Sequence, residues 1–189
     1  MRAGLAIVNL EARRDSNGHP TLYELPGNDG GGRWEIAGIN ERYHPEALER
    51  IKAADPKDRE KLCAEYIEQY TLEGTGLRGI SLSPGTRFYI LDTTFNRGPG
   101  GSAWIVQQAL RKLGYPVQID GQWGPKTRAS LEDADDKRAS RLLDALRLMR
   151  ERYEIERVGR RDNLWKGLAN RWDKALVIAR KWNEEELAP

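Results

Sequence analysis

Carboxylate side chains recur between residues 11 and 39, the stretch of this chain whose residue types best fit chemistry. The stretch contains Glu11, Asp15, Glu24, Asp29 and Glu35, together with Tyr23, Trp34 and three consecutive glycines. Glycosidic bonds are cleaved by a pair of carboxyl groups, one of which protonates the leaving oxygen. Glycines let a ligand approach the backbone closely. We therefore predict one wall of a carbohydrate-cleaving cleft here, with Glu11 as the proton donor.

The position of Glu11 supports this prediction. Apolar spacing predicts a short helix over residues 3–13, and Glu11 falls in its last turn, where a carboxylate is unfavourable to the helix dipole. A solvated surface glutamate is the alternative reading. For the second carboxylate we favour Asp29, because glycines around it leave room for sugar, and keep Glu35 as the other candidate. Glu24, next to a tyrosine, is the rival proton donor.

Four further residues are expected to contact a glycan. Tyr23, Trp34 and Asn96 offer aromatic faces or an amide for stacking and hydrogen bonding. Asp92 lies beside the apolar face of a helix predicted over residues 87–96. An acid there can also be a satisfied structural group, and that alternative stays open.

Composition excludes several other classes of protein. The net charge is +2, and the basic residues are interleaved with acids, so we expect no nucleic-acid partner; an anionic polymer such as a bacterial wall is compatible. The single Cys63 excludes an internal disulfide and fits a buried position in a chain that folds in a reducing compartment. His19 and His44 are isolated in the sequence, so no metal site and no cofactor are predicted.

Two features of the sequence bear on the route of this protein through the cell. The N-terminal apolar run is too short for a signal peptide, and no stretch approaches the ~20 apolar residues that span a bilayer. We expect a monomer that is made in the cytoplasm and acts in the periplasm or cell wall after holin-like or other export.

The predicted fold is mainly α and lysozyme-like, with a small β-hairpin near residues 21–36. The run 97–101, Arg-Gly-Pro-Gly-Gly, is expected to end one helix before the next begins near Ser102. We expect a catalytic region over residues 1–100. A helical region over 101–189 would pack on it, with one continuous domain as the alternative.

Several motifs together resemble the glycoside hydrolase family 108 muramidases, whose C-terminal part carries a predicted peptidoglycan-binding region. The motifs are Glu11 with the loop Tyr23–Gly32 and Ala37–Ile39; Leu91–Gly100; Val106–Leu110 with Asp120–Thr127; and Trp165–Arg171. The order and spacing of these weak motifs make the resemblance specific, and it covers nearly the whole chain.

The resemblance implies cleavage of the β-1,4 bond between N-acetylmuramic acid and N-acetylglucosamine in peptidoglycan, with Glu11 as the catalytic acid. This sequence departs from the family pattern just after that residue. The family's motif is Glu-Gly-Gly-Tyr, whereas here Glu11 is followed by Ala-Arg-Arg, and Tyr23 comes later than expected, as if residues had been inserted. A non-catalytic wall-binding module and a helical secretion accessory protein are the alternatives.

Overall fold

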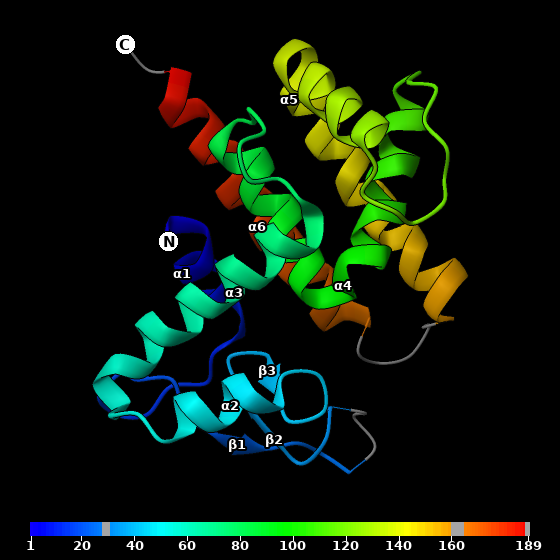
Figure 1. The fold of residues 1–189 in the computed structure, drawn as a ribbon. Coiled ribbons are helices and arrows are strands. Elements are labelled where there is room, and N and C mark those ends of the chain that lie inside the picture. The colour runs from blue at the N-terminus through cyan, green and yellow to red at the C-terminus, as the bar shows by residue number, and fades with distance from the viewer. Residues whose placement is uncertain (28–30, 160–164, 188–189) are drawn as a thin grey trace. The chain divides into compact units, whose positions relative to one another are not determined.

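The computed structural model describes residues 1–27, 31–159 and 165–187, and for Trp165 and Leu187 it describes the backbone only. The chain divides into two compact units, residues 1–70 and 71–189. Helix α3 (Arg59–Thr75) crosses this division, and the expected boundary at residue 100 lies inside helix α4 (Pro84–Lys112). Helices dominate and a small antiparallel sheet lies near the N-terminus, so the mainly α prediction is confirmed (Figure 1).

The first unit combines helices with the sheet. Its elements are α1 (Arg2–Glu11), β1 (Tyr23–Glu24), β2 (Trp34–Ile36), β3 (Ile39–Asn40), α2 (Pro45–Lys52), the 3-10 turn η1 (Pro56–Asp58) and most of α3. Strands β2 and β3 are joined by Ala37 and Gly38, which both have positive φ, as tight hairpin turns require. Pro45 occupies the first position of α2, where its missing N–H costs no helical hydrogen bond.

Helix α1 is held in place by its own apolar residues and by one glycine. Ile7 and Val8 are fully buried. A Cβ atom at Gly4 would lie only 2.1 Å from the carbonyl oxygen of Ala64, so only glycine permits this crossing of α1 over α3. The packing sets where the last residue of α1, Glu11, lies.

The second unit is helical throughout its described residues, apart from connecting loops. It contains α4, α5 (Pro125–Tyr153), the π-helical turn η2 (Glu154–Val158) and α6 (Trp165–Leu187). Within α4, Gly98 has a non-helical backbone (φ 68°, ψ 170°), and the two halves run in different directions (Figure 1). The predicted interruption at residues 97–101 is therefore confirmed. Within α5, Arg138 has a non-helical backbone (φ −159°, ψ 45°), so this helix is kinked there as α4 is at Gly98.

Candidate functional site

The register of the sheet brings Tyr23 and Glu35 together. Tyr23 pairs with Glu35 across strands β1 and β2, and side chains that face each other in this way share one side of the sheet. The Tyr23 hydroxyl donates a hydrogen bond to Glu35 Oε1. A hydrogen bond donated to a carboxylate favours its ionised form. The arrangement therefore holds a negative charge on Glu35.

Glu11 belongs to the same cluster, although it comes from a different element. It is the last residue of α1, and its charge acts on the Tyr23 hydroxyl. Burial, then the hydrogen bond and charge of Glu35, raise the pKa of Tyr23 far above its ordinary value; Glu11 raises it further and Arg13 lowers it. The structure thus brings Tyr23 and Glu35 into contact, and Glu11 is near enough for its charge to act on Tyr23; all three residues are half-buried.

Two other predicted residues lie on the opposite side of the sheet. Glu24 pairs with Trp34, and alternation along a strand turns both away from Tyr23. Glu24 is exposed and binds Arg33 at 2.9 Å, and the Arg33 guanidinium lies 5.1 Å from the centre of the Trp34 ring. The structure therefore separates them from the cluster. Asp29, the favoured second carboxylate, lies outside the described residues.

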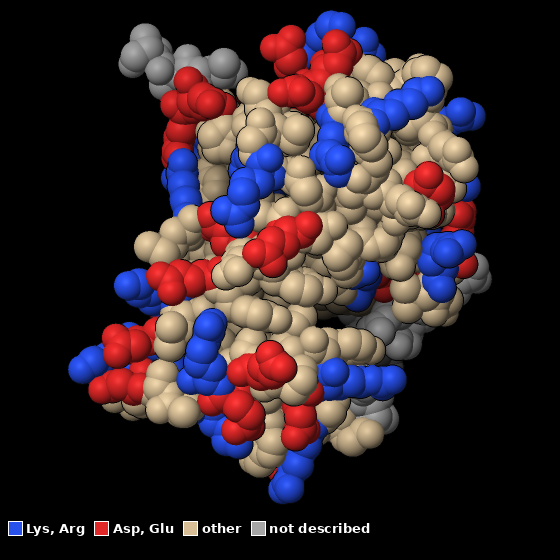
Figure 2. All heavy atoms as spheres, in the orientation of Figure 1, with Lys and Arg blue, Asp and Glu red and all other residues tan. Residues whose placement is uncertain are grey.

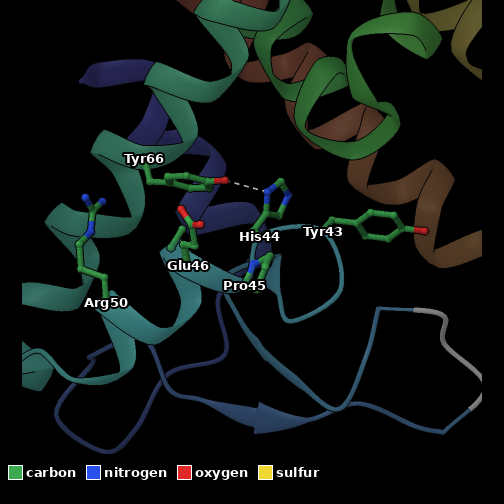
Figure 3. A pocket seen from close by; sticks show the side chains of 7 residues that line it. Tyr43, His44, Pro45, Glu46, Arg50 and Tyr66 are labelled. Atoms are coloured by element: carbon green, nitrogen blue, oxygen red, sulfur yellow. Dashed lines mark hydrogen bonds between the residues drawn. The ribbon is translucent and has the colours of Figure 1, made fainter.

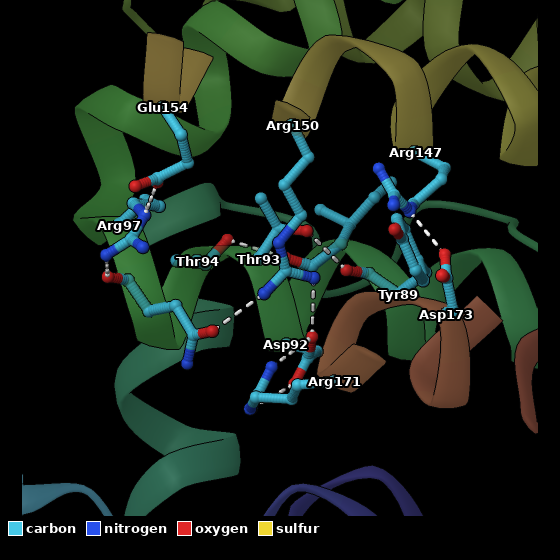
Figure 4. Close-up of polar contacts among 12 residues, drawn as sticks. Tyr89, Asp92, Thr93, Thr94, Arg97, Arg147, Arg150, Glu154, Arg171 and Asp173 are labelled. Atoms are coloured by element: carbon cyan, nitrogen blue, oxygen red, sulfur yellow. Dashed lines mark hydrogen bonds and ion pairs between the residues drawn. The ribbon is translucent and has the colours of Figure 1, made fainter. Parts of the chain in front are cut away.

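Asp92 and Asn96 belong to a polar network in the second unit, and Figure 4 shows Asp92 with its partners Arg150 and Arg171. Asp92 Oδ2 accepts from Arg150 Nη1 at 2.7 Å, and Asp92 Oδ1 accepts from Arg171 Nη2 at 2.7 Å. Asn96 Oδ1 accepts from the other terminal nitrogen of Arg150 at 2.7 Å. The side chains of Asp92 and Arg150 are both 0% exposed. Asp92 is therefore closed to a ligand in this structure and joins α4 to α5 and α6.

The motif over residues 106–127 is organised around the buried side chain of Gln107. The amide nitrogen of Gln107 donates to Asp120 Oδ1 (2.7 Å), the Gln122 carbonyl (3.0 Å) and Thr127 Oγ1 (3.3 Å). Its amide oxygen accepts from the backbone N–H groups of Asp120 (3.0 Å) and Gly121 (2.9 Å). Gln107 is almost completely buried. One side chain therefore fixes the loop between α4 and α5.

Replacing Gln107 by Leu is expected to lower the free energy of unfolding by about 2 kcal/mol, because the nearly buried amide makes five hydrogen bonds that leucine cannot replace. Urea denaturation followed by Trp fluorescence measures the loss, and the loop itself carries Trp123. Gln108→Leu is the matched control, with an expected change within about 0.5 kcal/mol. Equal stability of the two variants would contradict the role given to Gln107.

A pocket of about 530 Å³ lies at the start of α2 in the first unit (Figure 3). Its lining residues are Tyr43, His44, Pro45, Glu46, Ala47, Arg50 and Tyr66. The Tyr66 hydroxyl lies 2.8 Å from His44 Nδ1, and the His44 ring packs edge-on against Tyr70 at 4.9 Å between centres. Burial lowers the pKa of His44, so its ring is neutral at neutral pH.

The burial of His44 predicts a loss of stability in mild acid. A histidine whose pKa is lowered by folding contributes stability above its unfolded pKa of about 6.5, and this contribution is lost as the pH falls further. We expect the free energy of unfolding to drop between pH 7 and pH 5, as measured by urea denaturation. His44→Gln should flatten this part of the profile, whereas His19→Gln should leave it unchanged. The reverse pattern would assign the dependence to the other histidine.

Charges of both signs alternate over the molecular surface shown in Figure 2. Among the described residues, no three potential metal-binding side chains are grouped, and no helix is both long and apolar enough to cross a membrane.

Comparison with known proteins finds a family match within the second unit. Residues 101–177 match the family described as "Predicted Peptidoglycan domain" and so form a peptidoglycan-related domain. The match begins in the second half of α4, contains the loop that Gln107 fixes between α4 and α5, and ends within α6.

The fold of the whole chain is also found in a solved structure, that of SagA from Brucella abortus. The two share 17% sequence identity with a TM-score of 0.66, and the alignment covers 96% of this chain and 94% of that one. This likeness establishes a shared fold. No curated protein sequence matches this chain significantly.

Proposed function

We propose that this protein is a peptidoglycan hydrolase, an N-acetylmuramidase of the kind found in glycoside hydrolase family 108. One observation carries the proposal. The last residue of α1, Glu11, acts on the same tyrosine hydroxyl that donates to Glu35 from the neighbouring strand. Glycosidases use two carboxyl groups whose different surroundings give them different roles in cleaving the glycosidic bond.

The two carboxylates receive different roles. The Tyr23 hydroxyl donates a hydrogen bond to Glu35, which favours the ionised form of the carboxylate, so Glu35 acts as the base or as the group facing the oxocarbenium-like transition state. Glu11 follows Leu10, a half-buried apolar residue, and is the proton donor to the glycosidic oxygen. Protonation of that oxygen lets the aglycone leave as a neutral alcohol, and water completes hydrolysis at the anomeric carbon.

Peptidoglycan is the proposed substrate because of the second unit. Residues 101–177 match a predicted peptidoglycan domain, and the Gln107 network gives this domain a fixed loop between its helices. A domain that holds the wall polymer raises the local concentration of glycan around the catalytic residues of the same chain. We further propose that the protein reaches the periplasm or cell wall through holin-like or other export.

The test is digestion of purified peptidoglycan by the wild-type protein, followed by borohydride reduction and mass spectrometry of the fragments. A muramidase yields fragments that end in reduced N-acetylmuramic acid. Ends in reduced N-acetylglucosamine would overturn the bond assignment, and anhydro-muramic ends would overturn hydrolysis.

A non-catalytic wall-binding module is the second candidate function. It is favoured by the match over residues 101–177, which lies in the second unit and does not include Glu11, Tyr23 or Glu35. Sedimentation with peptidoglycan without any cleavage would support this module and overturn the muramidase.

A further inference from the structure

The residues that follow Glu11 form an ordered loop rather than an open insertion. Arg14 donates to the Gly18 carbonyl (2.6 Å), to Asn9 Oδ1 (2.5 Å) and to Glu60 Oε1 (2.5 Å). Its guanidinium therefore ties the loop to α1 and α3.

The loop is also closed on itself. Asp15 Oδ1 accepts from the backbone N–H groups of Asn17 (2.9 Å) and His19 (2.8 Å). The carbonyl of Arg13 accepts from the backbone N–H of Thr21 at 2.9 Å. The backbone of Arg13 is thus fixed beside the chain that leads into β1.

This geometry places the side chain of Arg13 on the candidate site. Its guanidinium carbon lies 3.9 Å from the centre of the Tyr23 ring, which is direct stacking distance. The hydroxyl of the same tyrosine donates a hydrogen bond to Glu35, so Tyr23 is held both by stacking and by hydrogen bonding. Arg13 therefore brings a positive charge to a cluster whose other ionisable members, Glu11, Tyr23 and Glu35, become neutral or negative.

We propose that Arg13 is a positioning residue of the catalytic pair, which stacks on Tyr23, holds its hydroxyl on Glu35 and offsets the negative charge of Glu11 and Glu35. The role rests on the proposed function of this site. Arg13 belongs to the segment after Glu11, where the sequence departs from the Glu-Gly-Gly-Tyr pattern. A guanidinium from this loop therefore acts on a site whose other residues come from α1 and the sheet.

The test compares Arg13→Gln and Arg13→Lys with wild type. Arg33→Gln is the matched control, because Arg33 also lies over an aromatic ring of the sheet, but on the side away from Tyr23. Side-chain carboxyl signals of ¹³C-labelled protein are titrated by NMR, with Glu11→Gln and Glu35→Gln to assign them. The pH profile of kcat/KM on peptidoglycan is measured in parallel.

In Arg13→Gln we expect the titration midpoint of Glu35 to move upward by about 0.5–1 pH unit, because a nearby cation and the hydrogen bond from Tyr23 both favour the ionised form. The acidic limb of the activity profile should move by the same amount, and kcat should fall about 10-fold. Arg13→Lys should restore most of the midpoint shift, since it keeps the charge. It should restore less of kcat, since an ammonium does not stack as a planar guanidinium does.

An unchanged Glu35 titration in Arg13→Gln would overturn the proposal, as would an equal shift in Arg33→Gln. The NMR titration needs no turnover. If the wild-type protein does not cleave peptidoglycan, the proposed function fails, and the titration still decides whether Arg13 acts on Glu35 through Tyr23.

Discussion

Replacing Glu11 by Gln is expected to lower the release of reducing ends from peptidoglycan by at least about 100-fold, the typical contribution of a positioned general acid. Gln keeps the size of the side chain and its hydrogen-bonding shape, but it has no carboxyl proton for the leaving oxygen. Its position should not change, because α1 is anchored by buried Ile7 and Val8 and by the crossing at Gly4. Unfolding in urea checks that the variant is as stable as wild type.

Glu35→Gln should also be strongly impaired, but with a different dependence on pH. A proton donor must be protonated, so its pKa defines the basic limb of the kcat/KM profile, whereas a base or nucleophile must be ionised and defines the acidic limb. The residual activity of Glu11→Gln should therefore lose the basic limb, and that of Glu35→Gln the acidic limb. Exchanged limbs would reverse the two roles.

Glu24→Gln is the control for both variants. Glu24 lies on the same strand as Tyr23 but faces the other side, is exposed and binds Arg33. We expect its activity to stay within about twofold of wild type, as for surface substitutions away from a site. Full activity in Glu11→Gln together with a large loss in Glu24→Gln would move the proton donor to the other side of the sheet.

Replacing Asp92 by Asn should have the largest effect on stability, a loss of about 3–5 kcal/mol in the free energy of unfolding. The amide preserves shape but leaves the fully buried Arg150 without its carboxylate, while Arg171 loses the same partner. An unpaired charge in the interior is far more costly than a broken surface pair. Asp173→Asn is the matched control: its pair with Arg147 is 2.6 Å long, its own side chain is 59% exposed, and its loss should cost no more than about 1 kcal/mol.

The pH dependence of the Asp92 effect follows from the same contacts. Burial alone would raise the pKa of Asp92, but Arg171 and Arg150 outweigh it and hold the pKa below its ordinary value of 3.8. Its contribution is therefore present above pH 4 and is lost as the pH falls through the folded value. The stability difference between wild type and Asp92→Asn should shrink below about pH 4. If Asp92→Asn instead has normal stability but binds peptidoglycan more weakly than wild type, Asp92 contacts the substrate, as the sequence predicted.

The helices could be read from the sequence because their signals are local. Apolar spacing marked the buried faces, and Gly98 marked the interruption of α4, where only a residue tolerant of positive φ fits easily. In α5 the acidic run over residues 133–136 is helical, and the kink follows two residues later, at Arg138. Buried Leu131 and Leu142 lie on either side of this kink.

The candidate site was predictable only in part. Glu11 and Tyr23 were identified by residue type, but the hydrogen bond between Tyr23 and Glu35 needed the register of two strands separated by a loop. Trp34 and Glu35 are neighbours in the sequence, and alternation along a strand places their side chains on opposite sides of the sheet. The separation of Trp34 from Glu35 was therefore predictable from the sequence. The partners of Asp92 could not, because Arg150 and Arg171 are 58 and 79 residues away and carry no local signal.

The crossing at Gly4 has a consequence for how this protein tolerates change. Glu11 lies about 10 Å along α1 from Gly4, at 1.5 Å per residue, and a helix of this length behaves as a stiff rod. The proposed acid is thus located by α1 itself, through the crossing at Gly4 and the buried Ile7 and Val8. We expect changes in residues 12–22, a new side chain such as Arg13 among them, to alter the surroundings of Glu11 more than its position, which makes this loop the place where the site can acquire new properties.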